Sequence, residues 1–180
     1  MNPLVKSIGI KYGLIVAAIS SGYYLIAYLF NEDLFANMGM GLAIMLSSFI
    51  ILILSVAALK KQQGGYITFK DAASVFTFAW IINAAVSIVV TILLFHVIDP
   101  ELGARVKEMT IETTIGMMER FGTPQEAMDE AIAKIEETDQ FSIGKIFQGN
   151  LMSIVFALIL GLIVAAFFKK EKPVFEDTVD

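Results

Sequence analysis

Four long runs without a charged side chain constrain the fold of this chain more than any other feature of its sequence. They cover residues 12–30, 39–59, 75–98 and 146–168. A helix rises about 1.5 Å per residue, so each run is long enough to cross a hydrocarbon core of about 30 Å. Backbone groups in lipid must find their hydrogen bonds within the segment, which favours helices. The sequence therefore predicts an all-α integral membrane protein with four transmembrane helices, forming a single membrane domain over residues 1–180.

The composition agrees with a membrane protein and limits the possible chemistry. Hydrophobic residues make up 57% of the chain and charged residues 17%, against about 45–50% and about 25% in soluble domains. The chain contains no cysteine, and its one histidine is His96. It also contains no phosphate-binding loop and no Ser-His-Asp arrangement. We therefore expect no catalytic residue, no cofactor and no metal site, and we predict that the protein is not an enzyme.

The distribution of basic residues predicts the orientation of the spans. If the chain crosses the membrane four times, eight of its 13 Lys and Arg residues fall on one side. These are Lys6, Lys11, Lys60, Lys61, Lys70, Lys169, Lys170 and Lys172. The connection on the other side, residues 31–38, contains Glu32 and Asp33 and no basic residue. By the positive-inside rule we expect both termini, including a tail at residues 169–180, to lie in the cytoplasm.

The segment between the third and fourth runs, residues 99–145, is then extracytoplasmic. It contains eleven acidic and five basic residues, a net charge of −6. Its sequence predicts a short insertion of two helices. Asp99-Pro100 starts the first helix and Gly122 ends it, and Thr123 with Glu126 forms a capping box for the second.

The second of these helices carries one apolar stripe on an otherwise acidic surface. The stripe consists of Met128, Ala131, Ile132 and Ile135. Two interpretations remain open. The stripe packs on the neighbouring helix or on the end of the bundle, or it contacts the membrane surface or a protein partner.

The fourth run has a small residue at every fourth position. These residues are Gly149, Ser153, Ala157, Gly161 and Ala165. Lipid supplies no hydrophobic drive between helices, so small residues that allow close backbone approach mark a helix–helix interface. The strip therefore predicts an interface on this helix. The partner helix belongs either to the same chain or to a second copy in a homodimer.

The third run carries a polar stripe at the same spacing, Asn83, Ser87 and Thr91. Such side chains hydrogen-bond between helices, typically for about 0.6 kcal/mol each. We favour this interpretation over a polar lining for a small-molecule or ion path, because no ionisable side chain accompanies the stripe. His96 lies near Asp99 at the end of the same run. We interpret His96 as a side chain at the water boundary in preference to a proton sensor.

Several short motifs, taken in order, resemble one bacterial membrane family. They are Lys11-Tyr12-Gly13-Leu14-Ile15, Lys60-Lys61 with Gly64-Gly65-Tyr66 and Phe69, Ile98-Asp99-Pro100, Thr123-Pro124-Gln125-Glu126-Ala127-Met128, and Ala165-Ala166-Phe167-Phe168-Lys169-Lys170. The family is catalogued as domain of unknown function 4199. The resemblance implies a four-helix protein of the bacterial inner (cytoplasmic) membrane. It implies no activity, ligand or catalytic residue.

These observations favour a non-enzymatic accessory or assembly protein that acts through helix–helix and outer-loop contacts. The alternative is a passive channel or small-molecule carrier formed by oligomerisation and lined by Asn83, Ser87 and Thr91. The expected partners are the lipid bilayer, a possible second copy at the fourth helix and a possible protein at the acidic outer segment. No nucleic-acid partner is expected, because the basic residues are dispersed near the membrane ends, where they meet anionic lipid.

Overall fold

The computed structural model describes residues 2–171, and most of this stretch is helical. Four helices are long and apolar enough to cross a membrane. They are α1 (Pro3–Phe30), α2 (Met38–Gln62), α3 (Phe69–Ile92) with its π-helical continuation η2 (Leu93–Ile98), and α6 (Ile143–Phe168). The prediction of an all-α membrane protein with four spanning helices is confirmed. Residues 172–180 of the expected cytoplasmic tail lie outside the described residues.

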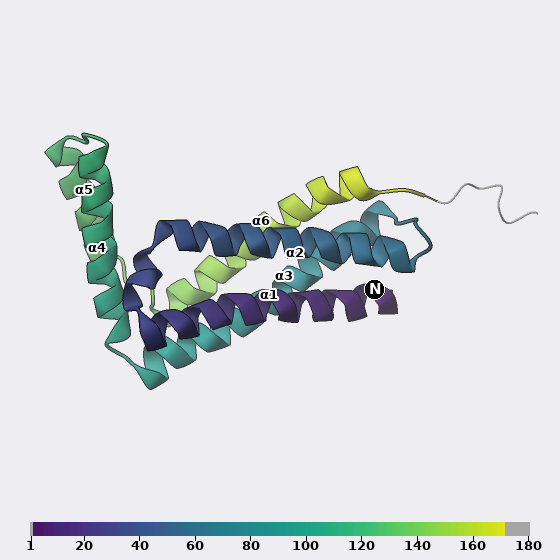
Figure 1. Cartoon of the computed structure of the whole chain (residues 1–180), viewed down its shortest axis with the longest axis horizontal. Coiled ribbons are helices and arrows are strands. Elements are labelled where there is room, and N and C mark those ends of the chain that lie inside the picture. The colour runs from purple at the N-terminus through teal and green to yellow at the C-terminus, as the bar shows by residue number, and fades with distance from the viewer. Residues whose placement is uncertain (1, 172–180) are drawn as a thin grey trace, which may run out of the picture.

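Three shorter helices connect the spans. The 3₁₀ helix η1 (Glu32–Ala36) joins α1 to α2, and α4 (Leu102–Arg120) and α5 (Gln125–Glu137) lie between η2 and α6. Figure 1 shows α4 and α5 as a hairpin that lies crosswise at one end of the four spans. We call this the hairpin end. The start of α1 and the loop between α2 and α3 lie at the opposite end.

The spanning helices are longer than the uncharged runs that predicted them. α1 begins at Pro3 rather than at residue 12, because the Asn2 side chain accepts a hydrogen bond from the Leu4 N–H at 3.0 Å. Proline also suits the first helical position. Lys6 and Lys11 are exposed on the added turns. Hydropathy marks the stretch that suits lipid, whereas the caps decide where a helix begins.

The turn between α4 and α5 is formed by residues other than those predicted. Gly122 ends α4 as expected, with a φ of +66°. The predicted capping box at Thr123 is wrong, since α5 begins at Gln125 after Pro124 and no side chain caps it. The Thr123 N–H instead donates to the Met118 carbonyl oxygen at 3.0 Å. Thr123 therefore completes the end of α4 and does not start α5.

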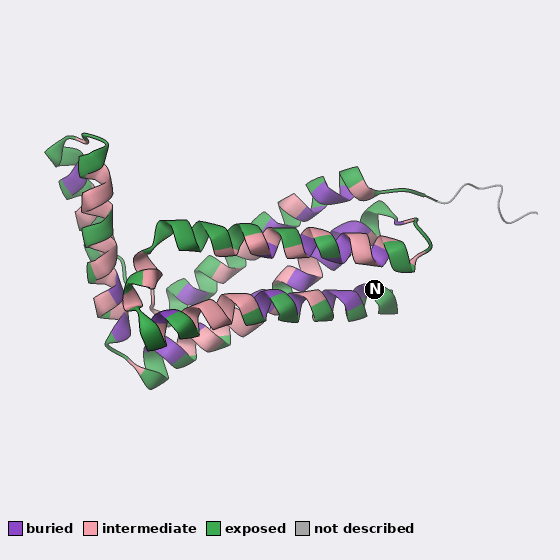
Figure 2. Cartoon of the chain, viewed as in Figure 1, coloured by how far each residue is buried: buried purple, intermediate pink, exposed green. Residues whose placement is uncertain are grey.

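α3 is the central helix of the bundle and packs against α1, α2 and α6. Phe76 and Ala79 on α3 are fully buried. Figure 2 shows the buried residues gathered where the spans meet, with exposed residues along much of α2 and α6. Many of these exposed residues are large and apolar. They give the bundle a surface that contacts the lipid bilayer.

α1 and α3 approach each other closely through small residues four positions apart on α1. A methyl group added at Gly9 would lie 2.6 Å from Cδ1 of Phe78, and one at Gly13 would lie 2.5 Å from the carbonyl oxygen of Ala79. Ala17 continues the series and is buried. The absence of side chains at Gly9 and Gly13 allows the two backbones to approach closely, which is how helices associate in lipid.

Replacing Gly13 with alanine should destabilise the protein. The added methyl group would meet the Ala79 carbonyl oxygen at 2.5 Å and Cβ of Ile82 at 2.7 Å, which forces α1 away from α3. Overpacking of this kind typically costs about 1–3 kcal/mol. Unfolding of the purified protein in detergent, followed by circular dichroism, measures the loss. The matched control is Gly149→Ala, because a methyl group there has no neighbour within 4 Å. Equal stability of Gly13→Ala and the wild type would contradict this close approach.

Candidate functional site

The hairpin joins the bundle through a cluster of apolar side chains that we call the junction. Its buried members are Leu94, Phe95, Leu102 and Val106, and Tyr24, Tyr28, Phe35, Met109 and Phe141 pack around them. The Phe95 and Phe141 rings stack with their centroids 4.1 Å apart, and Phe35 meets Phe95 edge-on at 5.7 Å. The junction therefore brings α1, η1, η2, α4 and the residues before α6 into one packed group.

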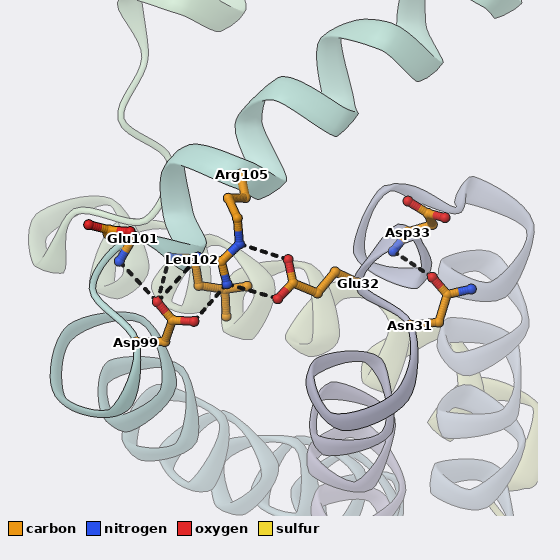
Figure 3. A network of polar contacts seen from close by, with 7 residues as sticks. All are labelled: Asn31, Glu32, Asp33, Asp99, Glu101, Leu102 and Arg105. Atoms are coloured by element: carbon orange, nitrogen blue, oxygen red, sulfur yellow. Dashed lines mark hydrogen bonds and ion pairs between the residues drawn. The ribbon is translucent and has the colours of Figure 1, made fainter.

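Arg105, in the first turn of α4, anchors the hairpin by binding two carboxylates (Figure 3). Its Nε and Nη2 donate to the two carboxylate oxygens of Glu32 in η1, at 2.9 and 2.8 Å. Nη2 also donates to Oδ2 of Asp99 at 2.6 Å. Bidentate, charge-assisted bonds of this kind fix orientation as well as distance. Arg105 therefore ties α4 both to the α1–α2 connection and to the end of η2.

Asp99 has a second role, in the turn that precedes α4. Its Oδ1 accepts hydrogen bonds from the backbone N–H groups of Glu101 and Leu102, at 3.2 and 3.1 Å. The prediction placed Asp99 immediately before the helix with Pro100 in its first turn. In the structure, Pro100 and Glu101 form a turn and α4 begins at Leu102. The predicted N-cap is therefore wrong in position, because Glu101 occupies the N-cap without a side-chain capping bond and the helix begins two residues later.

The hydrogen bonds from Arg105 also set the charge state of this group. They lower the pKa of Glu32 and the pKa of Asp99, and the two carboxylates in turn raise the pKa of Arg105. All three side chains remain partly exposed, at 21–39% of their surface. The group is therefore charged at neutral pH and acts as an anchor at the water boundary.

One further polar contact joins the two segments that flank the hairpin, and another joins its two helices. His96 donates from Nε2 to the carbonyl oxygen of Phe141 at 2.8 Å, just before α6. The ammonium group of Lys107 on α4 donates to the Glu136 carbonyl oxygen on α5. His96 is exposed, and its position at the water boundary stays a prediction.

α5 packs against α4 through the predicted apolar stripe. Met128 is buried and Ala131, Ile132 and Ile135 are half-buried. The opposite side of α5 is acidic and exposed, and its acids are Glu126, Asp129, Glu130, Glu136 and Glu137. The surface that α5 leaves open is therefore charged.

The small-residue strip on α6 lies mostly against α3. Trp80 donates from its ring N–H to the hydroxyl oxygen of Ser153 at 3.0 Å. Ala157, Gly161 and Ala165 are buried, and a methyl group added at Gly161 would lie 3.0 Å from Oγ1 of Thr77. Gly149 is exposed and has no neighbour within 4 Å of such a methyl group. Most of the strip thus packs against α3 of the same chain, and Gly149 is left without a packing partner.

The three residues of the polar stripe on α3 differ in their burial and in their hydrogen bonds. Asn83 is buried and accepts a hydrogen bond from the Ser20 hydroxyl group on α1, at 3.0 Å. Thr91 is buried and Ser87 is half-buried. Asn83 therefore links α1 to α3, while Trp80, one turn away, links α3 to α6.

Two features of the structure were not identified from the sequence. Gly9 was missed because it precedes the uncharged run that began the first predicted span, although its spacing to Gly13 and Ala17 matches the strip on α6. Arg105 was missed as an anchor because one of its partners, Glu32, lies 73 positions away. The sequence did offer one signal for this anchor, because Arg105 lies about one turn into a predicted helix that Asp99 was expected to cap.

Comparison with known proteins gives one match. The sequence profile of a family described as "Protein of unknown function (DUF4199)" matches residues 11–170. The chain belongs to this family. No curated protein and no solved structure matches it. This DUF4199 chain is thus a multi-pass membrane protein, and its role has to be argued from its own geometry.

Replacing Arg105 with alanine should release the hairpin while leaving the bundle folded. The chain has no cysteine, so spin labels can be placed on introduced cysteines at exposed Asp33 and Glu119, near the anchor and near the end of α4. Pulsed electron paramagnetic resonance then measures the distance between them. We expect a narrow distribution in the labelled wild type and a broad one with Arg105→Ala. The control is Lys134→Ala, which removes only the exposed pair with Glu130. An unchanged distribution in Arg105→Ala would show that the apolar junction alone holds the hairpin.

The same distance should depend on pH only under acidic conditions. The pKa values of Glu32 and Asp99 are lowered in the folded protein, relative to about 4 in an unfolded chain. Groups with lowered pKa values stabilise the fold above the unfolded value, and this contribution is lost as the pH falls through the folded values. We expect the same narrow distribution at neutral and mildly acidic pH, and broadening only well below pH ~4. Broadening already near neutrality would contradict a carboxylate anchor.

Proposed function

We propose that the protein is a non-enzymatic accessory or assembly protein that acts through contacts. The observation that carries this proposal is the hairpin, which lies crosswise to the spans, is anchored by Arg105 and presents an acidic side of α5. A helix pair fixed in this way is suited to receive a partner at the membrane surface. The charged side chains at the junction are already bound to one another, so they do not offer a reactive centre.

The proposed setting is the bacterial inner (cytoplasmic) membrane, with both termini in the cytoplasm. The positive-inside rule supports this orientation. Lys60, Lys61 and Lys70 lie at the end of the bundle opposite the hairpin, together with Lys169 and Lys170. This orientation makes the hairpin extracytoplasmic.

The exposed side of α5 favours a partner with basic side chains. The apolar stripe of α5 is used against α4, so the remaining surface offers carboxylates, of which Glu130 pairs with Lys134. Contacts between complementary charges at an exposed surface mainly increase association rate and specificity, and salt weakens them. The proposed partner is therefore a basic segment of another protein, bound in a salt-dependent manner.

A homodimer through α6 is a second possible contact. Ser153, Ala157, Gly161 and Ala165 are occupied against α3, so a dimer would use Gly149 and the exposed apolar residues beside it. The alternative function is a passive channel or carrier formed by oligomerisation. A path along Asn83, Ser87 and Thr91 would require the hydrogen bond between Asn83 and Ser20 to break. The channel or carrier is therefore the less supported alternative.

Cross-linking in native membranes tests the accessory role. A photo-reactive amino acid at Glu136, on the exposed side of α5, should give a discrete adduct with another protein. The double variant Glu126→Lys with Asp129→Lys should reduce the yield, and so should added salt, because both weaken attraction to a basic partner. The matched control is Asp33→Lys, which reverses an exposed acid outside the hairpin.

Two outcomes would contradict the proposal. The first is an adduct pattern that charge reversal on α5 leaves unchanged. The second is solute flux through liposomes containing the purified protein, provided that Asn83→Leu alters the flux. That second result would favour the channel.

A further inference from the structure

One face of α2 lies beside two openings in the bundle. Met38, Gly41, Met45 and Phe49 recur at intervals of three or four residues and so share this face. Met38 and Gly41 line a cavity of about 380 Å³ at the junction. Met45 and Phe49 line a crevice of about 220 Å³ among α2, α3 and α6. The face therefore leads from the hairpin end toward the middle of the bundle.

The crevice is apolar throughout. Besides Met45 and Phe49, it is lined by Leu46, Trp80, Phe156 and Leu160. The polar N–H of Trp80 is already bound to Ser153. α2 and α6 meet over a short stretch only, and at the end opposite the hairpin Lys60 donates to the Phe168 carbonyl oxygen at 2.8 Å. An unfilled apolar space loses dispersion contacts on every wall, so a crevice in a membrane protein favours a lipid chain.

A groove of about 700 Å³ lies at the hairpin end of the same face, between Met38 and the outer half of α4. Glu112, Gly116 and Arg120 line its α4 side. These three residues follow at intervals of four, so Glu112 and Arg120 flank Gly116 on one side of the helix. Within residues 2–171, neither Glu112 nor Arg120 forms a salt bridge. The groove thus presents an unpaired cation and an unpaired anion on either side of a glycine.

Gly116 has no role in packing. A methyl group added there would have no neighbour within 4 Å, and its backbone does not adopt a positive φ. Glycine inside a helix is less stable than alanine, so the fold alone gives no reason for it. Arg120 has a partial reason in the fold, because a cation is favourable in the last turn of a helix. Glu112 and Arg120 are both exposed, and the open space over Gly116 lies between them.

We propose that a single phospholipid with an ethanolamine headgroup binds along this face. Its phosphate binds Arg120, its ammonium group binds Glu112, and the headgroup lies over Gly116. One acyl chain follows α2 from Met38 to the crevice beside Phe49. These residues are eleven positions apart, or about 16 Å along a helix, which matches half of a hydrocarbon core of about 30 Å. The two charges distinguish this lipid from an anionic one, which has no group for Glu112. The proposal does not depend on the protein partner of α5.

Native mass spectrometry tests the proposal. The protein is first incorporated into nanodiscs of equimolar phosphatidylethanolamine and phosphatidylglycerol, then released into mild detergent. We expect one phosphatidylethanolamine per chain to remain bound. Arg120→Gln should weaken its binding about tenfold or more, because the charge-assisted hydrogen bond to the phosphate is lost. Glu112→Gln should retain a lipid but abolish the preference for ethanolamine.

Two pairs of variants separate binding from folding. Gly116→Leu fills the headgroup position, while Gly144→Leu alters another glycine with no neighbour within 4 Å. Leu46→Trp fills the crevice, while Leu158→Trp changes a similarly exposed residue on α6 that does not line it, the two being 50% and 46% exposed. We expect the first member of each pair to lose the lipid and the second to keep it, with all four variants still folded. Lipid retained equally by all variants, a preference for phosphatidylglycerol, or a second copy of the chain in place of lipid would each overturn the proposal.

Discussion

The contact between α1 and α3 is the constraint on which the bundle depends. In lipid, apolar side chains gain little by leaving their surroundings, so helices must associate through close packing and a few polar contacts. Gly9 and Gly13 allow α1 to approach α3 closely, and Ser20 with Asn83 adds a hydrogen bond between the same two helices. With α1 fixed on one side of α3, α6 occupies another through Trp80 and Gly161. The arrangement leaves α2 and α6 weakly connected to each other, which opens the crevice between them.

The hairpin depends on a different kind of interaction. The apolar side chains at the junction pack the hairpin against the bundle, but apolar contacts alone allow many orientations. Arg105 removes this freedom because its planar guanidinium group binds carboxylates from two separate elements. The crosswise position of α4 then creates both the groove beside Met38 and the acidic side of α5. The two surfaces from which we infer contacts therefore share one anchor.

The sequence predicted local features well and distant contacts poorly. The four spans, the stop at Gly122 and the apolar stripe of α5 could be predicted because each depends on neighbouring residues. The strip on α6 identified a face that packs closely, but spacing alone could not show that α3 occupies most of it. Arg105 and Glu32 could not be paired, because their contact exists only after α1, α3 and the hairpin are assembled. The groove beside Gly116 was also beyond the sequence, since its second wall is α2.

The position of Arg105 also bears on how deep each helix sits in the bilayer. Glu32 follows the end of α1, and Asp99 follows the end of η2, so a single guanidinium group holds the ends of two spans at one level. A slide of α1 past α3 by one helical turn, about 5.4 Å, would move Glu32 out of reach. At the opposite end, the backbone pairing of Ile67 with Lys170 ties the α2–α3 loop to the end of α6. The spans are thus held in vertical register at both membrane surfaces, so a local change in bilayer thickness must be met by tilting the whole bundle rather than by sliding one helix.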